Sequence, residues 1–302
     1  MYNLKTRWLS ALAMMALIAP AFASGASYAQ NDSRSFPETG KTVSGRFLQY
    51  WNANGGLAQQ GYPISEEMQE KSDTDGKNYT VQYFERAVFE KHPENKAPFD
   101  VLLSLLGNFL YQQKYSGNAP NQVASTENAR KFNETGKTLG GKFRAYWEAN
   151  GGLAQQGLPI SNEFMEKNDL NGKTYKVQYF ERAVFELHTE NAGTKFEVLL
   201  SQLGKFRYDQ KYANATEVNV DIVDFAFNPK VITVKVGTKV TWTQVGPTIH
   251  NTVSKQRVAG KFLWESPIMD KGQKYSYIFT QAGTYDYLCT LHPEMVAQVI
   301  VK

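Results

Sequence analysis

Apolar side chains in the first two thirds of the chain recur at helical spacing. Val43, Phe47, Tyr50 and Trp51 lie at helical spacing, with Tyr50 three and Trp51 four residues after Phe47, and Gly55 follows them. This spacing predicts an amphipathic helix, and the glycine predicts its end. The same pattern returns about a hundred residues later, in Leu139, Phe143, Tyr146, Trp147 and Gly151.

A β-rich stretch follows each predicted helix. In the first case it reads "DGKNYTVQYFERAVFEKH" and begins with an Asp-Gly turn signal. Leu102, Leu105, Leu106 and Phe109 then predict an apolar helix that closes the unit. Each unit is therefore expected to be a small α+β module.

The two units are copies of one another. "VQYFERAVFE" at Val81–Glu90 recurs without change at Val177–Glu186. "TGKTVSGRFLQYWNANGGLAQQGYPIS" (39–65) recurs as "TGKTLGGKFRAYWEANGGLAQQGLPIS" (135–161). Self-similarity at a fixed offset indicates a tandem duplication. The segment "SGNAPNQVAS" (116–125) is expected to link the copies.

After Tyr212 the pattern changes, and β-branched residues recur in alternation. "VNVDIVDFAFNPKVITVKVGTKVTWTQV" alternates β-branched and polar residues, and "VAQVIVK" ends the chain with one more predicted strand. Short alternating strands separated by turns are typical of a β-sandwich. The predicted organisation is multidomain: a module at 30–118, a second module at 119–215 and an all-β sandwich at 216–302.

The first residues have the pattern of a secretory signal peptide. Lys5 and Arg7 precede an apolar run, and the small residues Ser27 and Ala29 suit cleavage after residue 29. Removal of residues 1–29 lowers the formal charge from +4 to about +2, a balance that favours neither nucleic acid nor an anionic membrane. An exported protein is expected, at the cell surface, outside the cell or in the periplasm, with no later transmembrane segment.

The single cysteine has an unusual neighbourhood. In "YLCTLHPEM", Cys289 is followed by His292 and then by Met295, each three residues on. His250 lies in "GPTIHNTVS", 39 residues before the cysteine, and only the fold can bring it close. Thiolate, thioether and two imidazoles suit copper, and two His, one Cys and a weak axial Met form the blue-copper arrangement. Zinc accepts some of the same ligands, but its sites rarely use methionine.

Residues 217–302 resemble the cupredoxins, closest to the plastocyanin/amicyanin group. "FAFNPKVITVKVGTKVTW", "HNTVS" and "GTYDYLCTLHPEM" carry the resemblance, and the C-x-x-H-x-x-M spacing is of the amicyanin type. The resemblance implies an all-β Greek-key sandwich that holds one copper ion, Cu(I)/Cu(II), on His250, Cys289, His292 and Met295. It also implies that Asn251 ties the two ligand loops together. Its expected partner is Thr290.

One residue and one longer segment depart from that family pattern. Ala297 stands where a glycine is frequent, and "QRVAGKFLWESPIMDKGQ" (256–273) is not a close match. Neither includes a predicted ligand. The resemblance further implies that His292 is the electron port, reached through an apolar surface to which Leu291 and Pro293 belong.

The order "GYPIS…DGK…QYFE" in the copies is similar to LGFP-type modules of exported bacterial proteins. That similarity implies contact with cell wall or glycan and no chemistry. Glu85/Glu90 and Glu181/Glu186 could serve as acid–base pairs, although salt-bridged strand residues are the favoured interpretation. Structural roles are likewise favoured for Trp51, Trp147, His92 and His188.

The predicted function is one-electron transfer by an exported type 1 copper protein with a partner redox protein, not catalysis. Copper enzymes of related fold need further histidine-rich sites, and the chain has four histidines in all. Two alternatives stay open at this point. One is a wall- or glycan-associated repeat protein with an accessory copper domain. The other is copper storage or delivery.

Overall fold

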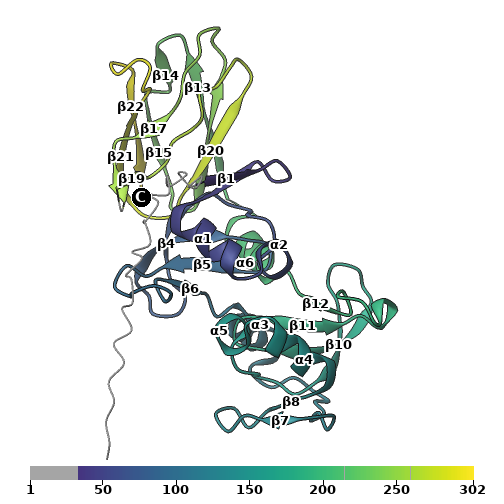
Figure 1. The fold of residues 1–302 in the computed structure, drawn as a ribbon. Coiled ribbons are helices and arrows are strands. Elements are labelled where there is room, and N and C mark those ends of the chain that lie inside the picture. Colours follow the sequence, from purple (N-terminus) through teal and green to yellow (C-terminus); the bar gives the residue numbers. More distant parts are fainter. Residues whose placement is uncertain (1–32, 214, 259) are drawn as a thin grey trace, which may run out of the picture. The chain divides into compact units, whose positions relative to one another are not determined.

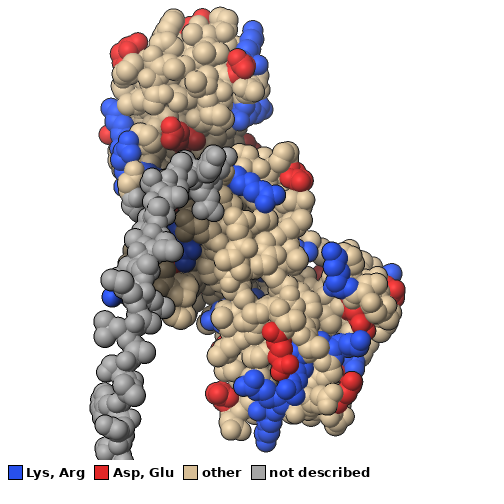
Figure 2. Space-filling model, viewed as in Figure 1, with Lys and Arg blue, Asp and Glu red and all other residues tan. Residues whose placement is uncertain are grey.

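The computed structural model describes residues 33–213, 215–258 and 260–302. The predicted signal peptide lies outside these residues. Within them, no helix combines the length and the apolar character needed to cross a membrane. Acidic and basic side chains are intermixed over the face shown in Figure 2, as expected for a chain with a small net charge.

Residues 217–302 form a sandwich of two four-stranded sheets (Figure 1), which confirms the β-sandwich prediction. One sheet has the order β14-β13-β16-β20, and the other has the order β15-β22-β21-β17. The pairs β13–β16 and β15–β22 are parallel, and the remaining pairs are antiparallel. The strands are β13 (Glu217–Val223), β14 (Ala226–Asn228), β15 (Val231–Val234), β16 (Thr238–Gln244), β17 (Val253–Ser254), β20 (Lys274–Phe279), β21 (Gly283–Leu288) and β22 (Val296–Val301), with a small hairpin of β18 (Arg257–Val258) and β19 (Lys261–Phe262).

The alternation seen in the sequence places one face of each strand in the core of the sandwich. Val220 and Ile222 of β13, Trp242 of β16 and Tyr287 of β21 are fully buried. Burial of an aliphatic side chain such as Val220 or Ile222 contributes roughly 1.5–3 kcal/mol. Cys289 and Met295 belong to the same core cluster, so the sandwich core supports the loop that carries them.

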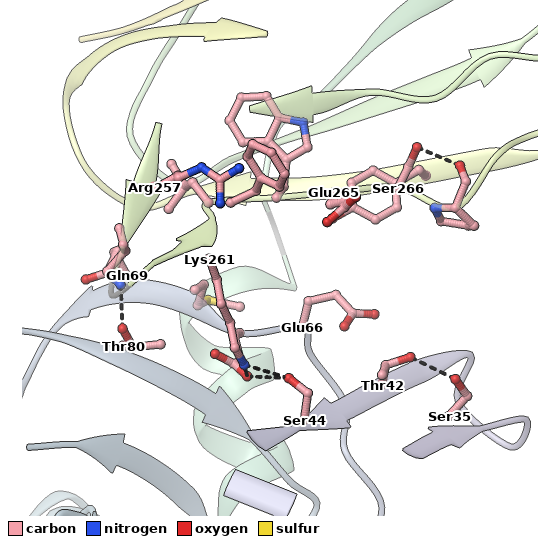
Figure 3. A pocket seen from close by; sticks show the side chains of 18 of the residues that line it. Ser35, Thr42, Ser44, Glu66, Gln69, Thr80, Arg257, Lys261, Glu265 and Ser266 are labelled. Atoms are coloured by element: carbon pink, nitrogen blue, oxygen red, sulfur yellow. Dashed lines mark hydrogen bonds and ion pairs between the residues drawn. The ribbon is translucent and has the colours of Figure 1, made fainter. Parts of the chain in front are cut away.

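The first copy contains a hairpin, two short helices, a four-stranded antiparallel sheet and a longer helix. The sheet has the order β3-β4-β5-β6. Figure 3 shows two of its local hydrogen bonds, Ser35 to Thr42 across the hairpin and Gln69 to Thr80 across β3 and β4. The elements are β1 (Ser33–Phe36), β2 (Lys41–Ser44), α1 (Gly45–Ala53), α2 (Gly56–Gln59), β3 (Met68–Lys71), β4 (Asn78–Tyr83), β5 (Val88–Lys91), β6 (Val101–Leu103) and α3 (Leu106–Tyr115).

The second copy repeats this order of elements, with a sheet of order β12-β11-β10-β9. A 3-10 turn, η1 (Thr189–Asn191), is inserted before β12. The elements are β7 (Arg130–Lys131), β8 (Thr138–Leu139), α4 (Gly141–Ala149), α5 (Gly152–Gln156), β9 (Phe164–Lys167), β10 (Thr174–Tyr179), β11 (Val184–Leu187), β12 (Val198–Leu200) and α6 (Leu203–Tyr212).

Three predicted helix starts were wrong, for the same physical reason. Val43 and Leu139 were assigned to helices but lie in the short strands β2 and β8, and both are fully buried. Leu102 lies in β6, and the helix expected there begins at Leu106. A short apolar run that faces the core fits either a helix or a strand, so local spacing does not separate them.

The last helix of each copy packs on the sheet of the other copy. Helix α6 lies against β4, and α3 lies against β10 (Figure 1). The ring of Tyr83 in β4 packs edge-on against Tyr208 and Tyr212 of α6. Tyr111 and Tyr115 of α3 make the matching contacts with Tyr179 of β10. The two copies thus share one buried cluster of side chains.

Polar contacts hold each exchanged helix in place. In α6, Lys211 and the Tyr212 hydroxyl donate hydrogen bonds to Glu70 of β3. In α3, Lys114 and the Tyr115 hydroxyl donate to Glu166 of β9, at 2.9 and 2.8 Å. Both carboxylates also accept a hydrogen bond from a tyrosine of their own sheet, Tyr83 or Tyr179.

The glutamines of the repeated "AQQG" motif form a second reciprocal contact between the copies. Gln59 donates to the Tyr146 hydroxyl, and Gln155 donates to the Tyr50 hydroxyl, both at 2.9 Å. Gln60 donates to Gln155 at 3.0 Å. Buried amides are stable only when their hydrogen bonds are made, and here each copy satisfies the amides of the other.

Candidate metal centre

Cys289, His292 and Met295 lie in one tight loop between β21 and β22. The N–H of His292 donates to the carbonyl of Cys289 at 3.3 Å, and the N–H of Met295 donates to the carbonyl of His292 at 2.9 Å. The loop is closed by a third bond, from the Cys289 N–H to the Met295 carbonyl at 3.1 Å. These three backbone hydrogen bonds within seven residues fix the backbone positions of Cys289, His292 and Met295.

The loop buries its two sulfur atoms and leaves its imidazole at the surface. Cys289 is fully buried and makes no disulfide, and Met295 is 2% exposed. His292 is partly exposed. The Cys289 Sγ lies 3.8 Å from the His292 Nδ1.

His250 approaches the same place from the loop after β16. It is fully buried, and both of its ring nitrogens lack a hydrogen-bond partner among the described residues. Burial lowers the pKa of the His250 imidazole, which favours its neutral, ligating form. The Thr248 backbone acts on this pKa in the opposite direction, so it lies near the ring. Buried polar groups are almost always paired, so an imidazole with a nitrogen left unpaired in a buried site indicates a ligand.

The fold brings the two predicted ligand loops together. The ring centroids of His250 and His292 lie 4.9 Å apart, although 42 positions separate them in the chain. The described residues contain no closed cluster of three or more His, Cys, Asp and Glu donors. A metal is therefore indicated by the short distances from His292 to Cys289 and to His250, by the unpaired His250 imidazole and by the chemistry of the donors.

These donors fit copper. Two imidazoles with a thiolate and a thioether combine the borderline and soft ligands that copper accepts in both of its oxidation states. No carboxylate is among the predicted ligands, which disfavours a hard cation such as Mg²⁺ or Ca²⁺. The buried surroundings of the sulfur atoms would also keep water away from the ion.

Asn251 joins the two loops by a reciprocal pair of hydrogen bonds. Its Nδ2 donates to the Thr290 Oγ1, and its Oδ1 accepts from the Thr290 N–H, both at 2.8 Å. Asn251 is the neighbour of His250, and Thr290 is the neighbour of Cys289. The pair therefore sets the spacing of the two loops directly beside their donor side chains.

The segment 264–269 supports His250 and was not found from the sequence. The N–H of Met269 donates to the His250 carbonyl at 2.7 Å. The indole N–H of Trp264 donates to the Thr252 Oγ1 at 3.1 Å, and its ring stacks on that of Trp242. This segment lies in the stretch that departs from the family pattern, so no motif pointed to it.

Most other candidate residues have contacts that fit structural roles. His92 contacts Glu90 and Glu94, and His188 contacts Glu186 and Glu190. Glu85 and Glu181 pair with the adjacent arginines of their own turns. Trp51 and Trp147 are buried and donate their indole N–H to the carbonyls of Gly61 and Gly157.

Comparison with known proteins places the C-terminal region in a family. Residues 214–302 match the copper binding proteins of the plastocyanin/azurin family. Amicyanin of Paracoccus denitrificans is 42% identical over 83 residues, which are 28% of this chain and 63% of that protein. Amicyanin-alpha of Methylorubrum extorquens is 36% identical over 90 residues, 30% of this chain and 76% of that protein.

Among solved structures, a purple cupredoxin from Nitrosopumilus maritimus is 30% identical, covering 28% of this chain and 99% of that one, with a TM-score of 0.26. The match spans 63% of the length of the Paracoccus relative, which is less than two thirds. It spans 76% of the length of the Methylorubrum relative. The cofactor of this chain is copper. Through its C-terminal residues, this chain belongs to the plastocyanin/azurin family of copper binding proteins.

Proposed function

We propose that the chain is an exported one-electron carrier that holds one copper ion with His250, Cys289, His292 and Met295. The observation that carries the proposal is the fully buried His250. Among the residues that the structure describes, neither ring nitrogen of His250 has a hydrogen-bond partner, and the ring centroid lies 4.9 Å from that of His292. When bound, copper supplies a reversible one-electron couple between Cu(I) and Cu(II).

The protein side chains hold the donors in place and exclude water. Asn251 and the closed loop from Cys289 to Met295 fix the donor positions before the metal binds. A site that does not rearrange between two oxidation states exchanges electrons with little reorganisation, because preorganised donors need not move. His292 is the partly exposed ligand and the point of contact for a partner redox protein.

Family membership supports the prediction that the chain is not an enzyme, since it groups the chain with copper proteins of the electron-carrier type. The histidines outside the C-terminal region are already engaged by glutamates. Export is proposed from the signal-like N-terminal pattern. Residues 30–215 are proposed to be two tandem modules, and their contact with wall or glycan stays a prediction.

The test is the visible spectrum of the copper-loaded full-length protein. We expect an intense band from thiolate-to-Cu(II) charge transfer that disappears on reduction. Cys289→Ser should abolish it, because a hydroxyl is a harder and less covalent donor than a thiolate. His92→Ala is the matched control and should keep the band. A Cys289→Ser protein with the full band would refute the site.

A further inference from the structure

Phe225 has a backbone conformation that an aromatic residue rarely adopts. Strands β13 and β14 form a hairpin in which Val223 pairs with Ala226, so Asp224 and Phe225 are its two turn residues. Phe225 has a φ of 57°, in the left-handed region. Glycine or asparagine is the usual residue at such a turn position, because a bulky side chain is strained there.

The strained conformation places the aromatic ring beside both histidines of the candidate copper site. The Phe225 ring meets the His292 ring edge-to-face, with centroids 4.8 Å apart and an interplanar angle of 86°. It meets the His250 ring in the same manner, at 5.8 Å and 85°. Phe225 is nevertheless 56% exposed, so its position is not explained by burial in a core.

The neighbouring loop fixes this turn. The N–H groups of Val245 and Gly246 both donate to the Ile222 carbonyl, at 3.0 and 3.1 Å. A Cβ at Gly246 would lie 3.0 Å from the Asp224 backbone nitrogen and 2.7 Å from the Asp224 Oδ1, so glycine permits this close approach of the loop to the turn. Strain of this kind persists where the surroundings determine it, and it is concentrated at functional sites.

We propose that Phe225 is a positioning residue that covers the exposed side of His292 and keeps small solutes off the copper site. This inference rests on the proposed copper function. The Phe225 ring acts through the two imidazoles. It limits the access of water and anionic ligands to them and leaves an apolar surface above His292. The strained φ of Phe225 is what places its ring over His292.

Two variants of the full-length protein test the cover. Phe225→Asn suits the left-handed conformation but removes the ring, so its melting temperature should equal or exceed that of the wild type. In the copper-free protein, His292 should react with diethyl pyrocarbonate about fivefold faster; in the Cu(II) protein, azide should bind about tenfold more tightly. Phe225→Leu restores an apolar cover and should return both values to within about threefold of wild type.

Phe196→Asn is the matched control, because Phe196 is an aromatic residue with similar exposure in the second copy. It should change neither quantity. The proposal is overturned if Phe225→Asn matches the wild type in both the diethyl pyrocarbonate reaction and azide binding. It is also overturned if the melting temperature of Phe225→Asn is far below that of the wild type, as expected for a variant of a core residue. A wild-type protein without the thiolate band would instead refute the copper function, while the copper-free reaction of His292 would still decide the role of Phe225.

Discussion

Met295 is the predicted donor whose role differs most from those of the other three. It is buried beside Cys289 and belongs to the same core cluster. A thioether is a soft and weak axial ligand that favours Cu(I), whereas an amide oxygen is harder and favours Cu(II).

Met295→Gln should therefore leave copper bound and the protein coloured but lower the reduction potential. We expect a fall of about 60 mV or more, which corresponds to a tenfold change in a one-electron equilibrium. Potentiometry of the two proteins in the same buffer is the measurement. An unchanged or higher potential would count against Met295 as the axial ligand.

Asn251 makes two hydrogen bonds to one residue, so its removal affects both ligand loops. Asn251→Ala should lower the free energy of unfolding of the C-terminal domain by about 2 kcal/mol, since each bond contributes roughly 1 kcal/mol. Thr290→Val removes only the bond to the Thr290 Oγ1 and should cost about half as much. Denaturant unfolding of the copper-free protein measures both. Equal losses for the two variants would show that the N–H bond of Thr290 contributes nothing.

The predicted donors were accessible to sequence reasoning because three of them lie within seven residues. Their chemistry identifies them without any knowledge of the fold. Phe225, Trp264 and Met269 were not accessible, because each contributes through contacts with residues distant in sequence. The one local signal was a phenylalanine in the two-residue turn of "VDFAF", where glycine or asparagine is usual.

At the scale of elements, the exchanged helices could not be predicted from local pattern. Helix α3 and helix α6 carry nearly the same sequence, and so do the sheets that receive them. Each helix therefore has the side chains needed for either sheet. Which sheet it covers depends on the connections and on the packing of the whole pair, which no window of sequence contains.

Gly107 and Gly204 make the exchange testable. A Cβ at Gly107 would lie 1.8 Å from the carbonyl oxygen of Phe180 in the other copy, and one at Gly204 would lie 2.0 Å from that of Phe84. A glycine-to-alanine change inside a helix normally stabilises it by about 1 kcal/mol. Here the backbone carbonyl leaves no room, so the sign should reverse.

Gly107→Ala should destabilise the protein by about 3 kcal/mol, within the range of overpacked cores. Thermal unfolding monitored by far-ultraviolet circular dichroism is the measurement. Lys205→Ala, next to Gly204 in α6, is the control and should change stability by no more than about 0.5 kcal/mol. If Gly107→Ala stabilised the protein, α3 would not lie against the second copy.

At the scale of the whole molecule, the predicted copper site lies within the C-terminal region. All four predicted donors, Asn251 and the core cluster around Cys289 lie within residues 217–302. The sheets of this region are complete by themselves, because each of their strands pairs with another strand of the same region. The two copies, by contrast, depend on one another for the helix that covers each sheet.

A fragment of residues 216–302 should therefore fold alone and give the copper spectrum of the full-length protein. Its roughly 87 residues are within the size range of independently folding domains. Copper should raise its melting temperature, because the ion binds the native state and not the unfolded chain. Absorption and circular dichroism of the fragment, with and without copper, are the measurements.

The complementary fragment, residues 30–212, should also fold, because it keeps both exchanged helices. It should show no thiolate band, since it contains no cysteine.

Residues 30–118 alone would leave the apolar surface around Tyr83 without α6, so this fragment should dimerise or aggregate rather than fold as a monomer. Sedimentation velocity separates these outcomes. A stable monomer of residues 30–118 would show that each copy can cover its own sheet. A C-terminal fragment without the full-length spectrum would show that the copies help to build the copper site.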